Sequence, residues 1–288
     1  MWRRWLLSAA VSAAWLATLA GPTPAWARFP SGTGGQFFVV CKTTRDLQVD
    51  PIVSPGVFPS AHLHTFFGHQ YIDQNSTPSA IVGGATLCRL SADSSGYWVP
   101  TAYRSDTGAE VVPRSAFAYY LGTKRTTETH YPVGTEMVGG DAHATQATQE
   151  GQHTIERFLC GGGTYRSLPY DCRPLGGAAH HFVQAIVYFP YCWNGQAATD
   201  HHNFTYGNLS TGACTIAPFT SRVPQLRLNV KYVGFQRGDL MTFSSGNGYT
   251  FHADWMDGWS PTKLNSLVDG CTNRHAQCPD LTDKNPGP

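Results

Sequence analysis

Short apolar runs, each closed by a turn, are the feature that most constrains what this chain can fold into. The strongest run, 182–189 (FVQAIVYF), is rich in β-branched and aromatic residues, and 226–235 (LRLNVKYVGF) alternates apolar and polar residues. Both patterns are typical of β-strands. Thirty glycines and 19 prolines supply turns along the 288 residues. The sequence therefore predicts an all-β fold, a β-sandwich or jelly roll with long loops.

Three further segments, 36–41, 81–90 and 97–104, are strand candidates by the same criteria. One or two short helices are expected, and the clearest begins at Ser260, a potential N-cap, with Pro261 in the first turn. No internal repeat or long linker divides the chain. We expect a single β-rich domain over residues 28–278, followed by a flexible polar tail at 279–288.

The first 27 residues have the features of a secretory signal peptide. Arg3 and Arg4 precede an apolar run over 5–20, and the segment ends in Ala25-Trp26-Ala27. A membrane anchor would need about 20 apolar residues and no cleavage motif. The sequence therefore predicts export, cleavage after Ala27, and a secreted protein with no stable membrane span.

Eight cysteines, an even number, are typical of a disulfide-bonded exported protein. No C-x-x-C motif is present, which disfavours a zinc knuckle or a thioredoxin-type site. Eight cysteines allow 105 pairings. Because short loops close most easily, we favour the sequential pairing. The expected bonds are 41–88, 160–172, 192–214 and 271–278.

Charge and known motifs exclude several classes of protein. The formal net charge is +1 and only 14% of residues are charged, so nothing suggests capture of nucleic acid or an anionic membrane. The sequence lacks G-x-S-x-G, H-E-x-x-H, a P-loop and G-x-G-x-x-G, which speaks against an α/β-hydrolase, a zincin, an NTPase and a dinucleotide enzyme.

Two i,i+2 pairs are the strongest candidates for a functional site. His62 and His64 occur in H-L-H, and His252 and Asp254 occur in H-A-D. On a strand, each pair shares one face. If the pairs converge, His62, His64 and His252 could hold a divalent metal such as zinc, copper or calcium. A carboxylate beside an imidazole is equally a proton-transfer pair, so a catalytic site without a metal stays open.

Other residues are secondary candidates for the site. Asp257 and His201 could join the catalytic residues, although a structural role is as plausible for His201. Amphipathic aromatic rings could stack on sugar rings as substrate-binding platforms, although core packing is favoured for any single one. The aromatic candidates are Tyr97, Trp98, Trp193 and Trp255.

Seven motifs in one order resemble a secreted domain-of-unknown-function family of actinobacteria and filamentous fungi, sometimes fused to WSC wall-binding modules. The resemblance extends from about Phe37 to Cys271. It departs at Phe204, where the family usually has a histidine. The motifs are DPIVSPG (50–56), HLH (62–64), YWVP (97–100), PVGTEMVGGD (132–141), FPYCWNG (189–195), DH (200–201) and GYTFHADW (248–255).

The resemblance implies export and a cell-surface or cell-wall polysaccharide setting, without an established activity. Together with the residues, it leads us to expect a secreted protein that acts on polysaccharide through a His/Asp-centred site, as a hydrolase or a lyase. The alternatives are a non-catalytic glycan-binding or wall-structural module, in which the histidines are structural, and a metal-scavenging surface protein.

Overall fold

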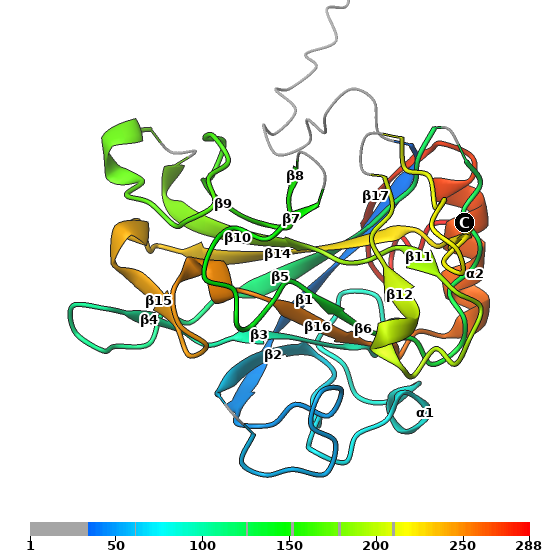
Figure 1. Ribbon diagram of the computed structural model, residues 1–288, viewed down its shortest axis with the longest axis horizontal. Coiled ribbons are helices and arrows are strands. Elements are labelled where there is room, and N and C mark those ends of the chain that lie inside the picture. Colours follow the sequence, from blue (N-terminus) through cyan, green and yellow to red (C-terminus); the bar gives the residue numbers. More distant parts are fainter. Residues whose placement is uncertain (1–33, 61, 125, 151–152, 178–179, 209–210) are drawn as a thin grey trace, which may run out of the picture.

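The structure is a computed structural model that describes residues 34–60, 62–124, 126–150, 153–177, 180–208 and 211–288. The predicted signal peptide, residues 1–27, lies outside these ranges. One large curled sheet dominates the described residues (Figure 1). Its strands are, in spatial order, β6 (Glu136–Gly139), β16 (Ala253–Met256), β3 (Gly96–Pro100), β2 (His64–Gly68), β1 (Gln36–Leu47), β5 (Ser115–Leu121), β14 (Gln225–Val233), β10 (Phe182–Tyr188) and β9 (Glu156–Cys160), with β17 (Gln277–Leu281) parallel to β1.

Small sheets and short helices complete the described residues. The small sheets are β11 (Cys192–Trp193) with β12 (Phe204–Thr205) and β13 (Ser221–Arg222), β4 (Ala102–Arg104) with β15 (Met241–Phe243), and β7 (Gln149–Glu150) with β8 (His153–Thr154). The helices are α1 (Pro78–Ile81) and α2 (Pro261–Leu267), the 3₁₀ turns η2 (Arg173–Leu175), η4 (His201–Asn203), η5 (Gly238–Leu240) and η6 (Gly248–Thr250), and the π turn η7 (Val268–Thr272). The predictions of an all-β fold and of one or two short helices are confirmed.

Strand β1 is shared by the two halves of the large sheet. Residues 36–42 pair with β5, whereas residues 43–47 pair with β2 after a register irregularity between Thr43 and Arg45. Such an irregularity bends a strand and increases its twist. The two layers of the expected sandwich are therefore two halves of one sheet that curls around a common core.

The main core lies between these two halves. Phe37 of β1 stacks on Tyr120 of β5, with ring centroids 4.6 Å apart, and Trp255 of β16 packs edge-on against Tyr120. A second cluster, which contains Phe66 and Trp98, lies on the opposite face of β2, β3 and β16. It is covered by segments 48–60 and 69–95, so these three strands are buried on both faces.

The strand predicted over 81–90 is wrong. Ile81 ends helix α1, and Gly83 with φ +73° turns the chain. Only isolated bridges follow, from Thr86 to His69 and from Cys88 to Cys41. Pro78 in the first helical turn provides a reason, because its fixed φ favours a helix start there.

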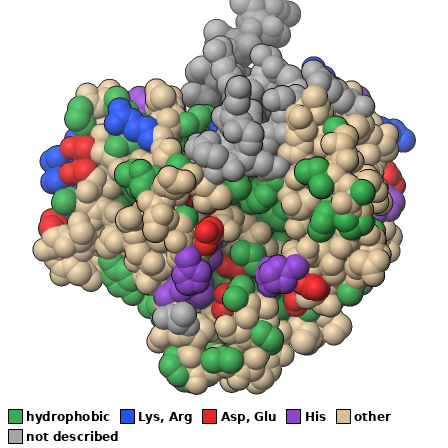
Figure 2. All heavy atoms as spheres, viewed as in Figure 1, with side chains coloured by type: hydrophobic (Ala, Val, Ile, Leu, Met, Phe, Trp, Pro, Cys, Tyr) green, Lys and Arg blue, Asp and Glu red, His purple; other side chains and the backbone are tan. Residues whose placement is uncertain are grey.

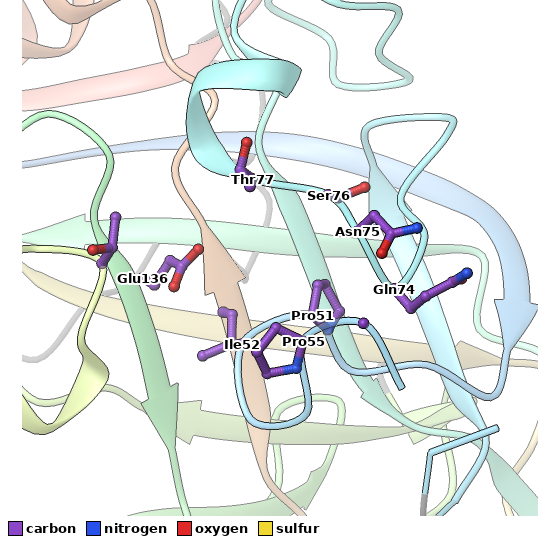
Figure 3. A pocket seen from close by; sticks show the side chains of 10 residues that line it. Pro51, Ile52, Pro55, Gln74, Asn75, Ser76, Thr77 and Glu136 are labelled. Carbon is purple, nitrogen blue, oxygen red and sulfur yellow. The ribbon is translucent and has the colours of Figure 1, made fainter. Parts of the chain in front are cut away.

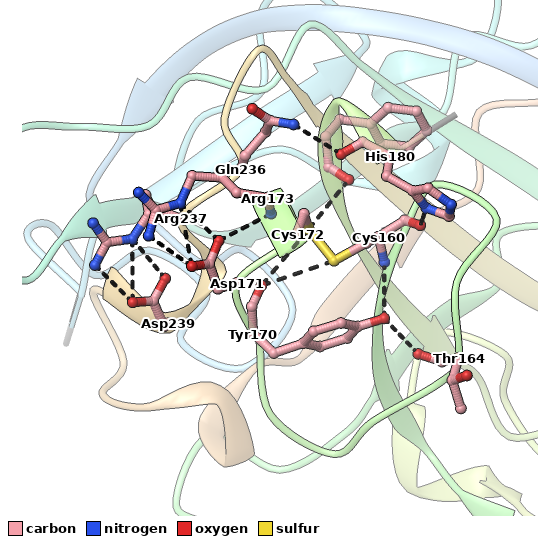
Figure 4. Close-up of a disulfide and its surroundings, with 11 residues drawn as sticks. Cys160, Thr164, Tyr170, Asp171, Cys172, Arg173, His180, Gln236, Arg237 and Asp239 are labelled. Atoms are coloured by element: carbon pink, nitrogen blue, oxygen red, sulfur yellow. Dashed lines mark hydrogen bonds and ion pairs between the residues drawn. A yellow bond between two sulfur atoms is a disulfide. The ribbon is translucent and has the colours of Figure 1, made fainter. Parts of the chain in front are cut away.

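All eight cysteines form disulfides, and the sequential pairing is confirmed as Cys41–Cys88, Cys160–Cys172, Cys192–Cys214 and Cys271–Cys278. Figure 4 shows the surroundings of Cys160–Cys172. The hydroxyl of Tyr170 accepts a hydrogen bond from the Cys160 amide at 3.3 Å and donates to the Thr164 carbonyl at 2.7 Å. These contacts tie the loop after β9 back onto the end of that strand.

The C-terminal segment is attached to the domain. Leu281, which lies within the predicted flexible tail, is buried and pairs with Val39 of β1. The Ser266 hydroxyl donates to the carbonyl of Pro288 at 3.0 Å. The β-rich domain therefore extends beyond residue 278. Among the described residues, no helix has the length and apolar character needed to cross a membrane.

Candidate functional site: a histidine centre

The strand register places two histidines on one face of the sheet, away from the main core. His64 begins β2 and pairs with Pro100 of β3, and Asp254 of β16 pairs with Trp98 of β3. If the β3–β16 register is continued by two residues, His252 lies opposite Pro100 from the other side. The two imidazoles therefore flank a proline, whose compact ring leaves room for them to approach each other.

His62 completes a group of three imidazoles, which we call the histidine centre. The Nε2 atoms of His62 and His252 are 3.3 Å apart. The ring centroid of His64 lies 4.3 Å from that of His62 and 5.7 Å from that of His252. One nitrogen of each residue lies within 4.8 Å of the others. The convergence of His62, His64 and His252 expected from their spacing is thus present.

Main-chain carbonyls fix the tautomers of the two buried histidines. Nδ1 of His64 lies 2.9 Å from the carbonyl oxygen of Val49, and Nδ1 of His252 lies 2.8 Å from that of Thr250. Because a carbonyl oxygen only accepts, each Nδ1 must carry the proton. The Nε2 atoms of both neutral rings are left with a lone pair, as in histidines that bind metals.

Burial keeps the histidine centre neutral. It lowers the pKa of His252 to about 4, and it lowers the pKa of His64 well below the usual value, with a further contribution from His252. The pKa of the partly exposed His62 is also lowered by burial and then by His143. Neutral imidazole is the form that coordinates a metal.

Two buried carboxylates lie beneath the imidazoles. Asp254 is fully buried, and its Oδ2 lies 4.0 Å from Nε2 of His252. A carboxylate oxygen of Asp50 lies within 4.8 Å of both Asp254 and His64, and Asp50 Oδ1 accepts hydrogen bonds from the amides of Ile52 and Val53. Burial raises the pKa of Asp254 well above its usual value, and Asp50 adds to this rise.

Hydrogen bonds among the described residues do not pair every polar atom of the histidine centre and the two carboxylates beneath it. His62 could donate Nε2–H to Nε2 of His252 across the 3.3 Å separation. That bond leaves Nε2 of His64 and both carboxylate oxygens of Asp254 buried without a hydrogen-bond partner among the described residues. Each such atom costs about 1–3 kcal/mol. A metal ion held by the three imidazoles would pair Nε2 of His64, and its charge would offset that of Asp254.

The geometry and donor atoms fit zinc or copper. Two nitrogens bound tetrahedrally to zinc at about 2.0–2.1 Å are roughly 3.3 Å apart, which is the observed separation of the His62 and His252 nitrogens. His62, His64 and His252 would be the ligands, with Asp254, whose Oδ2 lies 4.0 Å from Nε2 of His252, as a close counter-charge. Calcium fits poorly, since it takes six to eight oxygen ligands.

Two of the other predicted catalytic residues lie elsewhere. Asp257 follows the far end of β16, where its Oδ1 accepts from the Trp259 amide at 3.0 Å. His201 lies in η4, its ring centroid 4.0 Å from that of His202, in a separate group with Asp200. Figure 2 shows histidine and acidic side chains on either side of a hollow on one face. Neither Asp257 nor His201 belongs to the histidine centre.

Three of the four predicted sugar platforms are core residues. Tyr97, Trp98 and Trp255 are each 0% exposed, because β3 and β16 carry a hydrophobic cluster on both faces. They cannot stack on a sugar in this fold. Trp193 is partly exposed and lies parallel to Phe204, with ring centroids 6.4 Å apart and planes inclined by 19°.

Residues outside the predicted set also approach the histidine centre. His143 and Asp141 interact electrostatically with His252, and His143 also acts on His62. His143 is exposed, on the loop after β6. Asp141-Ala142-His143 repeats the i,i+2 spacing of the other two pairs, so this spacing could have identified Asp141 and His143 as candidates from the sequence. Asp50 offers no comparable signal, because its place depends on the folding of the loop.

Comparison with known proteins identifies a family but no activity. Residues 50–259 match the model of a family described as a domain of unknown function (DUF1996). The matched range contains every residue of the histidine centre and both buried carboxylates. No curated protein and no solved structure matches the chain.

Proposed function

Since this chain belongs to the DUF1996 family, whose description names no activity, we propose a function from the histidine centre itself. The proposed protein is a secreted, metal-dependent hydrolase that acts on polysaccharide at the cell surface or in the cell wall. His62, His64 and His252 hold one zinc or copper ion, and Asp254 balances part of its charge.

The observation that carries this proposal is the set of buried polar atoms without a partner. Nε2 of His64 and both oxygens of Asp254 are buried, with Asp50 and His252 close by, and lack a hydrogen bond within the described residues. Buried polar groups in proteins are almost always paired. A cation at the meeting point of the imidazoles would pair Nε2 of His64 and offset the charge of the nearby Asp254.

The donor set favours hydrolysis of an acyl group over cleavage of a glycosidic bond. A metal held by three histidines lowers the pKa of a bound water and polarises a carbonyl. Glycosidases instead use two carboxyl groups that flank the scissile bond. Asp50 and Asp254 do not flank an open space, because both are buried beside His64. The reaction we propose is removal of ester-linked or amide-linked acyl groups from a polysaccharide.

We assign to His143 the proton transfer that this reaction requires. The oxygen of water bonds to the acyl carbon, and the bond from that carbon to the sugar oxygen or nitrogen breaks. One proton of the water must reach the leaving group. His143 is exposed and acts electrostatically on His62, and its imidazole can accept this proton and then donate it.

Export and the choice of polysaccharide are part of the proposal. Four disulfides are consistent with an extracellular protein. The polysaccharide setting rests on the resemblance to wall-associated proteins, and the partly exposed Trp193 is the remaining aromatic candidate for contact with a sugar.

The test is release of acetate from acetylated polysaccharides by tag-free, metal-loaded protein. We expect release that disappears with a chelator, returns with zinc or copper, and falls strongly in His143→Gln. The control His130→Gln alters an exposed histidine paired with Asp269, and should behave like the parent. New reducing ends or unsaturated sugars would replace this proposal with glycosidic hydrolysis or elimination. Binding without any product would favour the glycan-binding alternative.

A further inference from the structure

A second concave site lies on the same side of the sheet as the histidine centre. It has a volume of about 360 Å³, which falls within the range of small-molecule sites. Pro51 and Ile52 form part of its wall, Gln74 and Asn75 lie on one side, and Glu136 of β6 lies on the other (Figure 3). Nothing in the function proposed above uses this pocket.

Glu136 is the most informative residue of the pocket. It is 8% exposed, and its amide donates to the carbonyl of Ala198 at 2.9 Å. Among the described residues, its carboxylate has neither a hydrogen bond nor an ion pair. Burial raises the pKa of Glu136 to about 7, and Asp50 contributes to the rise. A carboxylate in this position lacks donors that a ligand could supply.

The opposite wall offers groups that both donate and accept hydrogen bonds. Gln74 and Asn75, which carry amide groups, line this wall, and Thr77 and Thr199, which carry hydroxyl groups, also line the pocket. Pro51 and Ile52 add an apolar surface. A sugar has the matching character, since its hydroxyl groups donate and accept while its C–H faces are apolar.

We propose that this pocket binds one sugar unit of a neutral polysaccharide, with Glu136 accepting hydrogen bonds from its hydroxyl groups. Acidic sugars are disfavoured, because Glu136 and the nearby Asp50 would repel a carboxylate or sulfate. The choice of a polysaccharide rests on the function proposed above, but binding in this pocket needs no metal.

Asp50 connects the pocket to the histidine centre. Its carboxylate lies within 4.8 Å of His64 and Asp254, and the next two residues, Pro51 and Ile52, line the pocket. A sugar unit held at Glu136 would therefore place a neighbouring unit of the same chain toward the histidine centre. The pocket is in this sense a substrate-positioning subsite.

The experiment is calorimetric titration of the metal-free protein at about pH 8.5, where Glu136 is ionised, with neutral trisaccharides of glucose, mannose and N-acetylglucosamine, and with trigalacturonate as the acidic probe. At least one neutral trisaccharide is expected to bind, and trigalacturonate is expected to bind more weakly or not at all. Glu136→Gln should weaken binding by about tenfold, the loss typical of one hydrogen bond to a charged group. Asn75→Ala, at an exposed position, should weaken it too.

Glu110→Gln is the matched control, since it removes the same charge from an exposed site outside the pocket. It should bind as the parent does. Equal thermal midpoints would show that the variants fold. The proposal is overturned if no neutral trisaccharide binds, if trigalacturonate binds best, or if both pocket variants bind like the parent. Because no metal is present, none of these outcomes depends on the histidine centre.

Discussion

The Nε2 atoms of His62 and His252 lie 3.3 Å apart, although 190 positions separate these residues in the sequence. His62 comes from the segment before β2, and His252 from the segment before β16. Strand β3 lies between β2 and β16, and Pro100 is the residue of β3 that pairs with His64. The closeness of the two nitrogens is thus a product of the sheet order, and it creates a meeting point that His64 also reaches.

Replacing His64 should weaken metal binding severely. His64→Gln removes a nitrogen ligand but keeps a side chain that can still donate to the carbonyl of Val49. We expect a loss of affinity larger than the roughly 10- to 100-fold typical of an outer-shell partner. Competition with a chelator of known affinity measures the loss, and His130→Gln serves as control. A parent-like affinity for His64→Gln would remove His64 from the ligand set.

Asp254→Asn should affect metal affinity and stability in different ways. The amide has no charge to balance a cation, so metal affinity should fall by about 10- to 100-fold. The metal-free variant should unfold at the same temperature or a higher one, because a buried carboxylate without a partner is unfavourable. Chelator competition and thermal unfolding provide the two measurements. Unchanged affinity would show that Asp254 is only structural.

Asp257 should give stability a pH dependence that Asp257→Asn reduces. Burial raises the pKa of Asp257 to about 7, from 3.8 for an ordinary aspartate. Between these values the folded protein holds a proton that the unfolded chain has released, so stability falls as pH rises. The contribution is at most about 1.4 kcal/mol per pH unit. Urea unfolding of the metal-free protein between about pH 4.5 and about pH 6.5 should show a smaller fall for the variant. Identical slopes would contradict the assignment.

Trp255 should contribute to stability and not to sugar binding. It is buried against Tyr120 and Tyr131, so Trp255→Ala should lower the free energy of unfolding by about 3–5 kcal/mol. Trp193→Ala, at a partly exposed position, should cost about 1 kcal/mol or less. Urea denaturation distinguishes the two. A small loss for Trp255→Ala would mean that the ring is less well packed than the structure indicates.

Local pattern was sufficient for much of the fold. Segments 182–189 and 226–235 became β10 and β14 because apolar character and β propensity agree there. The 81–90 segment has similar composition, but a helical turn and Gly83 precede two isolated bridges. The division of β1 between two partners was beyond prediction, because it depends on pairing with strands far away in the sequence.

The histidine centre was predictable for a simple reason, and its surroundings were not. His62 and His64, and likewise His252 and Asp254, are two residues apart. In an extended segment such residues point to the same face, and this does not depend on the tertiary structure. Trp98 and Trp255 stayed candidates for sugar contact because that period cannot tell an exposed face from one covered by distant loops, and the structure buries both. The sequence places Glu136 in a family motif but gives no sign of a pocket, since the pocket forms only when residues 51–56, 74–77 and Thr199 come together around it.

The most direct test of the account is the metal content of tag-free protein. The protein is stripped with a chelator, reloaded separately with zinc and with copper, dialysed, and measured by mass spectrometry of the elements. We predict one equivalent of zinc or copper per chain in the parent, and almost none in a variant with His62, His64 and His252 all changed to glutamine. A parent that retains neither metal, or a triple variant that retains as much as the parent, would contradict the proposed metal centre.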